Sequence, residues 1–193
     1  AKQQAKLFDD DKEQVKLTAG IMWHKVERQT DEMGLKAELT TFVPYTQDKV
    51  ELTKVTITNT ADTTQKITST VAIPMYARSA SNIRDHRHVT SLLHRTFTIK
   101  DGIMIYPTLT FDERGHNKNT VFYGALAKEM INGKMESPFS FCPVTEEFIG
   151  EGGNFENPYY VAKNKPLPYT EGQEVDGYET VAAIRFNDCE LKP

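Results

Sequence analysis

Apolar residues recur at every second position in several segments of the sequence, and this period of two limits the chain to strand-based folds. The segments 35–43 and 66–75 show it most clearly. Successive side chains of a strand point to opposite faces, so each segment predicts a strand with one buried and one exposed face. No segment shows a long apolar repeat of 3.6 residues, which would indicate an amphipathic helix. The pattern predicts an all-β, antiparallel β-sandwich with only short helical turns.

A β-hairpin is predicted around Asp101-Gly102. Apolar residues alternate on both sides of this dipeptide, and Asp-Gly is favoured in two-residue turns because both residues tolerate positive φ. The segment 50–59 differs from the others, since its apolar residues change parity midway. A β-bulge inserts one extra residue and would restore a single apolar face. The sequence therefore predicts a bulge near Thr53.

Shorter apolar segments between turn-forming residues predict the remaining elements. We expect strands over 120–125 and 179–186, and short helical turns over 126–131 and 144–149. The polar residues 1–19 are expected to precede a single sandwich domain that covers residues 20–193.

The charge balance argues against nucleic acid as a partner. The chain has 23 basic and 27 acidic residues, a net charge of -4, and no block of like charge that would form a phosphate-binding arm. No apolar run reaches the roughly 18 residues that a membrane span needs, so no membrane partner is expected. Cys142 and Cys189 form no CxxC motif and no disulfide framework. This favours a reducing, cytoplasmic compartment, with the periplasm as the alternative.

Histidines gather in the segment Asp85-His86-Arg87-His88, and His94 follows six residues later. Alternate strand positions would place His86 and His88 on one face. A zinc site needs three or four ligands, however, and the neighbouring arginines add positive charge that opposes a dication. We therefore predict no metal site and interpret these histidines as hydrogen-bonded loop residues.

Other reactive residues lack the partners that catalysis needs. The acidic pairs Asp112-Glu113 and Glu146-Glu147 are adjacent in sequence, and neighbours on a strand point to opposite faces. Cys142 has no nearby histidine and is expected to be buried and inert. The stretch Gly150-Glu151-Gly152-Gly153 lacks the lysine and hydroxyl residue of a phosphate loop. No catalytic residue is predicted.

Aromatic residues offer a different chemistry, because an exposed ring can stack on the apolar face of a sugar. Packing in the core is the commoner role of any single ring. The candidates are Trp23, which is the only tryptophan, and Tyr159, Tyr160, Tyr169 and Tyr178.

Three stretches, in this order and spacing, resemble a known family. They are Gly34-Leu35 with Glu38 and Phe42-Val43-Pro44, then Val50-Glu51-Leu52 through Val55-Thr56-Ile57-Thr58-Asn59, and last Phe148-Ile149-Gly150 with Gly152-Gly153 and Asn157-Pro158. Together they resemble the amino-terminal super-β-sandwich domain of the carbohydrate phosphorylases of glycoside hydrolase family 94, formerly glycosyltransferase family 36. Cellobiose phosphorylase is a member.

The resemblance implies a larger enzyme that acts on β-linked glucosides, a phosphorylase or glycosyltransferase. In such enzymes an (α/α)₆ barrel carries the general acid and the site for inorganic phosphate, the co-substrate. The sandwich would be a non-catalytic accessory domain that packs on the barrel and takes part in homodimer contacts, without a cofactor of its own. We expect interdomain or sugar contacts from Trp23, Gly150, Gly152, Gly153, Asn157 and Tyr159.

Two other functions remain open. A stand-alone carbohydrate-binding β-sandwich would have the same fold and would use its tyrosines to bind glycans. A small enzyme in its own right would have to use residues such as Asp85, His86, His88 and Asp112.

Overall fold

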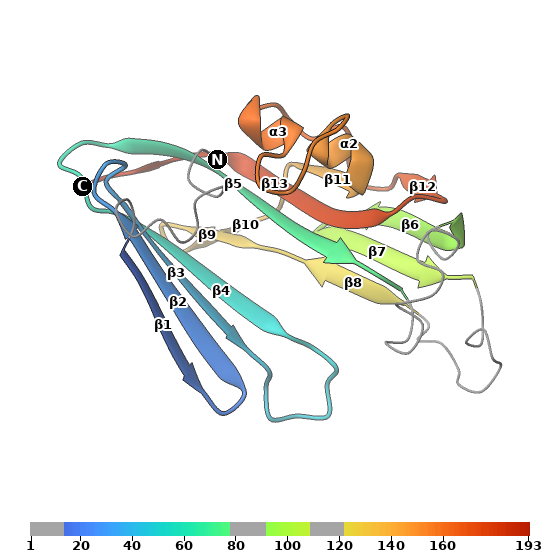
Figure 1. Ribbon diagram of the computed structural model, residues 1–193, viewed down its shortest axis with the longest axis horizontal. Coiled ribbons are helices and arrows are strands. Elements are labelled where there is room, and N and C mark those ends of the chain that lie inside the picture. Colours follow the sequence, from blue (N-terminus) through green and yellow to red (C-terminus); the bar gives the residue numbers. More distant parts are fainter. Residues whose placement is uncertain (1–13, 78–91, 109–121) are drawn as a thin grey trace. The chain divides into compact units, whose positions relative to one another are not determined.

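The computed structural model describes residues 14–77, 92–108 and 122–193, and they form antiparallel strands with two short helices (Figure 1). The chain divides into two compact units: unit 1 includes Thr68–Asp188, and unit 2 includes Lys6–Ile67 and Cys189–Pro193. The strands β5 (Gln65–Met75) and β13 (Thr180–Leu191) each run from one unit into the other. The predicted single domain over 20–193 and its polar leader over 1–19 stay predictions, although β1 already begins at Gln14.

Unit 2 contains one antiparallel sheet in which the strands follow one another in sequence order. Its strands are β1 (Gln14–Gly20), β2 (Trp23–Thr30), β3 (Leu35–Phe42) and β4 (Leu52–Asn59). The strand predicted over 35–43 is confirmed as β3. The bulge predicted near Thr53 is wrong, because β4 pairs with β3 in an unbroken register from Leu52↔Phe42 to Asn59↔Leu35. Val50 lies outside the strand, and Leu52, the first residue of β4, points to the face opposite Val55 and Ile57, so the parity changes without a bulge.

Unit 1 contains two larger sheets and a small hairpin. The first sheet has the order β11-β13-β5, and the second has the order β12-β6-β7-β8. Besides β5 and β13, the strands and helices of unit 1 are β6 (His94–Ile99), β7 (Gly102–Pro107), β8 (Tyr123–Leu126), β9 (Glu129–Ile131), β10 (Lys134–Glu136), β11 (Ser140–Val144), α2 (Thr145–Ile149), α3 (Tyr159–Ala162) and β12 (Glu174–Asp176).

The elements predicted in this part of the chain are largely present. Strands β5, β8 and β13 match the predicted segments 66–75, 120–125 and 179–186, of which residues 120 and 121 lie outside the described residues. The helical turn over 144–149 is α2, but the one predicted over 126–131 is wrong. Strand β9 occupies that segment and pairs with β10. The turn between them, Asn132-Gly133, has φ values of 52° and 78° and so supplies a two-residue hairpin turn.

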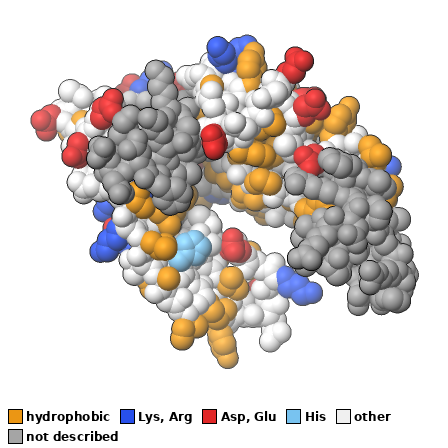
Figure 2. All heavy atoms as spheres, in the orientation of Figure 1, with side chains coloured by type: hydrophobic (Ala, Val, Ile, Leu, Met, Phe, Trp, Pro, Cys, Tyr) orange, Lys and Arg blue, Asp and Glu red, His pale blue; other side chains and the backbone are white. Residues whose placement is uncertain are grey.

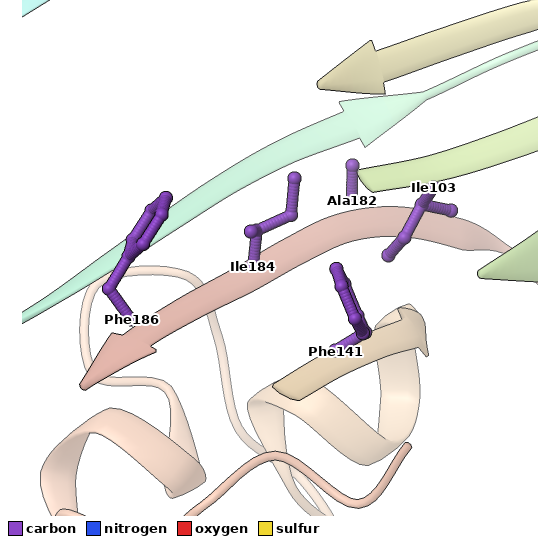
Figure 3. Close-up of a cluster of buried hydrophobic side chains, with 5 residues drawn as sticks. All are labelled: Ile103, Phe141, Ala182, Ile184 and Phe186. Carbon is purple, nitrogen blue, oxygen red and sulfur yellow. The ribbon is translucent and has the colours of Figure 1, made fainter. Parts of the chain in front are cut away.

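The two larger sheets of unit 1 share a buried core, which makes this unit a sandwich. Figure 3 shows Ala182, Ile184 and Phe186 of β13 gathered with Phe141 of β11 and Ile103 of β7. On the opposite face of the first sheet, a second core cluster consists of Cys142, Phe148, Leu167, Val181 and Ala183. Strand β13 is therefore buried on both faces, which explains the unbroken apolar run from Val181 to Ile184.

The hairpin predicted around Asp101-Gly102 is confirmed, but its turn lies one residue earlier. Gly102 already belongs to β7 and pairs with Ile99 of β6. The turn residues are Lys100 and Asp101, and neither they nor Gly102 has positive φ. A glycine is needed here for another reason: a Cβ atom at this position would lie 2.0 Å from the carbonyl oxygen of Ala125 in β8.

Candidate functional site

Four of the six predicted contact residues lie on the loop between α2 and α3, which we call the 150–158 loop, and a fifth, Tyr159, directly follows it. Both of its ends are fixed in the protein, since Phe148 is fully buried before it and Pro158 is buried at its end. The ring of Phe155 packs toward Phe148, with 6.2 Å between the ring centroids. Residues 151–157 between these anchors are exposed. The loop is thus a fixed support with a solvent-facing surface.

The glycines of this loop have local structural roles. Gly150 has a φ of 82° and lies against Tyr159, whose Cβ atom would be 2.8 Å from a Cβ added to the glycine. Gly153 donates a backbone hydrogen bond to the carbonyl oxygen of Gly150 at 2.9 Å. A Cβ on Gly153 would lie 2.1 Å from the carbonyl oxygen of Ile149. Gly152 has a φ of 65° and open space around it. These residues shape the loop, and of the three only Gly152 has free space beside it.

The tip of the loop is held by the side chain of Asn154. Its Oδ1 atom accepts hydrogen bonds from the backbone N–H groups of Glu156, at 3.0 Å, and Asn157, at 3.2 Å. Asn157 itself is exposed. The exposed residue Asn157 therefore has its backbone N–H group held by Asn154.

Tyr159 is the first residue of α3, and at the surface it is hydrogen-bonded to the charged side chain of Lys165. Its hydroxyl oxygen accepts a hydrogen bond from Lys165 Nζ at 2.7 Å, and 38% of the residue is exposed. This hydrogen bond and the lysine charge lower the pKa of the Tyr159 phenol and raise that of Lys165. The ring of Tyr160 meets Tyr159 edge-on, with 5.3 Å between centroids. The pair can offer an ammonium and a polarised phenol to a polar partner.

The Tyr169 phenol and the Cys142 thiol of this region favour their neutral forms. Tyr169 donates a hydrogen bond to Glu147 Oε1 at 3.2 Å, and burial together with this carboxylate raises the pKa of the phenol. Burial raises the pKa of the Cys142 thiol to about 12. The thiolate is the nucleophilic form of cysteine, so this residue is unreactive at neutral pH, as the sequence predicted. Glu146 is exposed on the same helix.

Sequence reasoning missed the arginine that anchors the segment after α3. Arg185 of β13 is only 6% exposed, and it donates hydrogen bonds to the carbonyl oxygen of Lys165 at 2.8 Å and to Asn164 Oδ1 at 2.6 Å. Asn164 is held at a φ of 49°. The anchor fixes Lys165, which in turn binds Tyr159. The sign of this role in the sequence was a single arginine among the apolar residues of β13.

An aromatic cluster on the sheet β12-β6-β7-β8 was also missed. Phe97 and Tyr106 stack at 5.2 Å, and Phe122 meets Tyr106 edge-on at 6.2 Å. Tyr106 is 38% and Phe122 is 51% exposed. In the strand register, Tyr106 pairs with Arg95, whose guanidinium forms an ion pair with Asp176 at 3.4 Å. The hairpin register alone brings these residues together, so the spacing in the sequence gave no sign of them.

The other candidates lie elsewhere. Trp23 belongs to unit 2, where it begins β2 beside Gly20 and is 41% exposed. The interpretation of His94 as a loop residue is wrong, because it lies buried in strand β6, where its ring meets Tyr76 edge-on at 6.0 Å. Asp85, His86, His88 and the pair Asp112-Glu113 lie outside the described residues.

The described residues contain neither a metal-binding cluster nor a helix that could span a membrane. Within 14–77, 92–108 and 122–193, no group of three or more His, Cys, Asp or Glu side chains is arranged to hold a metal ion. No helix in the same ranges has the length and apolar character that would let it cross a membrane.

Comparison with known proteins agrees with the fold. No match was found among curated proteins. A family model described as "Glycosyl hydrolase 94, supersandwich domain" matches residues 11–193, which is nearly the whole chain. The sandwich of unit 1, the antiparallel strands throughout and the resemblance of three separate stretches all agree with this match. The chain therefore belongs to the family of glycosyl hydrolase 94 supersandwich domains.

Proposed function

We propose that this domain is the non-catalytic accessory part of a carbohydrate phosphorylase-like enzyme that acts on β-linked glucosides. An (α/α)₆ barrel of the same polypeptide would carry the catalytic acid and bind inorganic phosphate. The domain would support that barrel and contribute to a homodimer, without a cofactor. The two cysteines of the sequence form no CxxC motif and no disulfide framework, which fits a reducing compartment, so we place the enzyme in the cytoplasm.

The observation that carries this proposal is the fixed but exposed 150–158 loop. Docking surfaces bind best when they are already ordered, because little conformational entropy is then lost on association. Buried Phe148, the cap by Asn154 and the anchor through Arg185 supply this order. The exposed amide of Asn157 and the Tyr159–Lys165 pair supply polar contacts. We propose that these side chains contact the barrel near its active site.

The test uses the full-length polypeptide and a β-linked disaccharide with phosphate. We expect phosphorolysis by this polypeptide and none by residues 1–193 alone. Tyr159→Ala and Asn157→Ala should each lower kcat/KM by about tenfold, the effect of losing roughly 1.4 kcal/mol of transition-state stabilisation. Tyr45→Ala, at a residue of unit 2 that is 98% exposed, is the matched control and should leave the rate unchanged. Equal rates in all variants would contradict the role of the loop, and activity of residues 1–193 would contradict the accessory function.

One observation favours a second candidate, a carbohydrate-binding module. The Phe97–Tyr106–Phe122 cluster combines exposed rings with the Arg95–Asp176 ion pair, and sugars bind where rings meet their C–H faces and charged groups meet their hydroxyls. Calorimetry of the chain with cello- and chito-oligosaccharides tests it. Binding that Tyr106→Ala abolishes and Tyr45→Ala preserves would support this candidate, and flat titrations would contradict it.

A further inference from the structure

The segment around and after α3 carries positive charge without matching negative charge. Residues 157–170 contain two lysines, Lys163 and Lys165, and no aspartate or glutamate. Neither lysine forms an ion pair within the described residues, whereas Lys128 and Lys134 of the same unit each pair with a carboxylate. Figure 2 shows basic side chains at the surface in the region where Figure 1 places α3. The two lysine charges are therefore available to an anion from outside the chain.

The backbone that carries these lysines is fixed from two directions. The N–H group of Lys165 donates a hydrogen bond to the carbonyl oxygen of Tyr160 at 3.0 Å. Arg185, which is only 6% exposed, donates to the carbonyl oxygen of Lys165 at 2.8 Å and to Asn164 Oδ1 at 2.6 Å. Both acceptors are neutral and a guanidinium group is always protonated, so Arg185 adds a third positive charge beside the segment.

The Tyr159–Lys165 pair is arranged to donate further hydrogen bonds. Because Lys165 Nζ donates to the Tyr159 hydroxyl oxygen at 2.7 Å, the O–H group of the phenol is directed to another acceptor. No group of the described chain accepts it, and the ammonium keeps two further N–H groups. The neighbouring cation also polarises the phenol, which strengthens it as a donor. The pair thus presents O–H and N–H donors from adjacent atoms, as the oxygen atoms of an anion require.

The charges that act on this pair are positive. The hydrogen bond and charge of Lys165, and in addition the charge of Lys163, lower the pKa of the Tyr159 phenol, and no carboxylate of the described chain contributes to this shift. Glu147 of α2 is engaged elsewhere, since it accepts a hydrogen bond from Tyr169 at 3.2 Å. An anion bound at the pair would therefore meet two lysine side chains without a competing carboxylate.

We propose that Tyr159, Lys163 and Lys165 form a binding site for a dianionic oxyanion, with a phosphate group as its ligand. A phosphate group carries up to two negative charges, which match the two lysines, and three oxygen atoms that can each accept a hydrogen bond. A carboxylate carries one charge and two oxygen atoms, so it is expected to bind more weakly. The proposal goes beyond the proposed function, since it requires binding by residues 1–193 without a barrel.

Nuclear magnetic resonance of the nitrogen-15-labelled chain, titrated with inorganic phosphate, tests this site. At about pH 8 phosphate is mainly the dianion. At constant ionic strength, the amide signals of Asn164 and Lys165 should shift and saturate, with a Kd on the order of 1–10 mM, because exposed charged contacts are weak in water. Lys165→Gln and Lys163→Gln should each raise this Kd at least about threefold, and Tyr159→Phe about twofold, since each removes a donor. Lys134→Gln, at a lysine whose side chain is 80% exposed, is the matched control and should leave the Kd unchanged.

Acetate and methyl phosphate are titrated in parallel to identify the ligand class. Tighter binding of either phosphate than of acetate would support the proposal, and the tighter of the two would distinguish free phosphate from the phosphate group of a larger molecule. Shifts that do not saturate, an unchanged Kd in Lys165→Gln, or acetate binding as tight as phosphate binding would each overturn it. Phosphorolysis by the full-length polypeptide is assayed separately. An inactive polypeptide whose residues 1–193 bind phosphate contradicts only the proposed function, and an active one whose residues 1–193 do not bind it contradicts only this site.

Discussion

At the scale of single residues, Gly102 shows how close backbone contact can require a glycine. It pairs with Leu126 at the start of β7, and an added Cβ would lie 2.0 Å from the carbonyl oxygen of Ala125. We expect Gly102→Ala to lower the free energy of unfolding by about 1–3 kcal/mol, since the backbone of β8 must shift. Urea unfolding measures this. Gly124→Ala is the control, because its Cβ would meet only the flexible Met104 side chain, and an equal loss there would contradict the explanation.

The Tyr159–Lys165 pair gives a second prediction at this scale. The hydrogen bond from Lys165 and its charge lower the pKa of the Tyr159 phenol. Lys165→Gln removes the charge, so the pKa of Tyr159 should rise toward its usual value. The measurement is the phenolate absorbance during a titration, compared with Tyr159→Phe to identify the signal. An unchanged phenol titration in Lys165→Gln would show that the two side chains do not interact in solution.

The sequence pointed to the candidate site only where a residue type has one common structural role, as glycine has at positions of positive φ. Gly150 and Gly152 drew attention to the 150–158 loop, and both do have positive φ. Asn154 and Arg185 could not be assigned, because their roles depend on partners that the fold brings near. Arg185 is 20 residues from Lys165, and only the fold brings its guanidinium group to the carbonyl oxygen of Lys165.

At the scale of elements, alternation predicted strands well and turns less well. Strand β3 keeps its period of two from Leu35 to Thr40, whereas 126–131 has too few residues to distinguish a helical period from a strand. Pairing with a neighbour decided the second case, since β9 pairs with β10 through the Asn132-Gly133 turn. Pairing also excluded the bulge near Thr53. Register is a property of two strands, so the pattern of one strand cannot determine it.

Lys25 and Lys36 each form ion pairs with both Glu27 and Glu38 on the sheet of unit 2, and these ion pairs predict a dependence of stability on pH. The hydrogen bond from Lys25, with the charge of Lys36, lowers the pKa of Glu27, although partial burial opposes this. A carboxyl with a lowered folded-state pKa adds stability above its unfolded pKa and loses it as the pH falls through the folded value. The stability difference between wild type and Glu27→Gln should therefore be present near pH 7 and shrink as the pH falls below about 4.3, the usual pKa of glutamate.

Urea unfolding at several pH values checks this prediction. Glu51→Gln, at an exposed glutamate outside these ion pairs, is the control and should show a smaller difference at every pH. A difference for Glu27→Gln that grows on acidification would contradict the assigned sign.

At the scale of the whole molecule, the family and the sandwich were predictable, but the division into two units was not. Among the described residues, every buried hydrophobic side chain except Cys189 belongs to unit 1. The sequence pattern does not distinguish the strands of the two units, because Val15, Leu17 and Ala19 of β1 alternate as regularly as Ile103 and Ile105 of β7. Whether an apolar face is covered depends on a second layer, and a strand's own residues do not reveal it.

This unequal burial predicts that the two units unfold at different denaturant concentrations. Unit 2 has little buried apolar surface to oppose the entropy of unfolding, whereas unit 1 has two core clusters. Trp23, the only tryptophan in the sequence, lies in unit 2 and reports on it alone. We expect the fluorescence of Trp23 to change at a lower urea concentration than the one at which Val181–Ile184 of β13 lose their protection from hydrogen exchange. A single transition, with both signals changing at the same urea concentration, would contradict this prediction. It would mean that β5 and β13, which run through both units, couple the units into one cooperative domain.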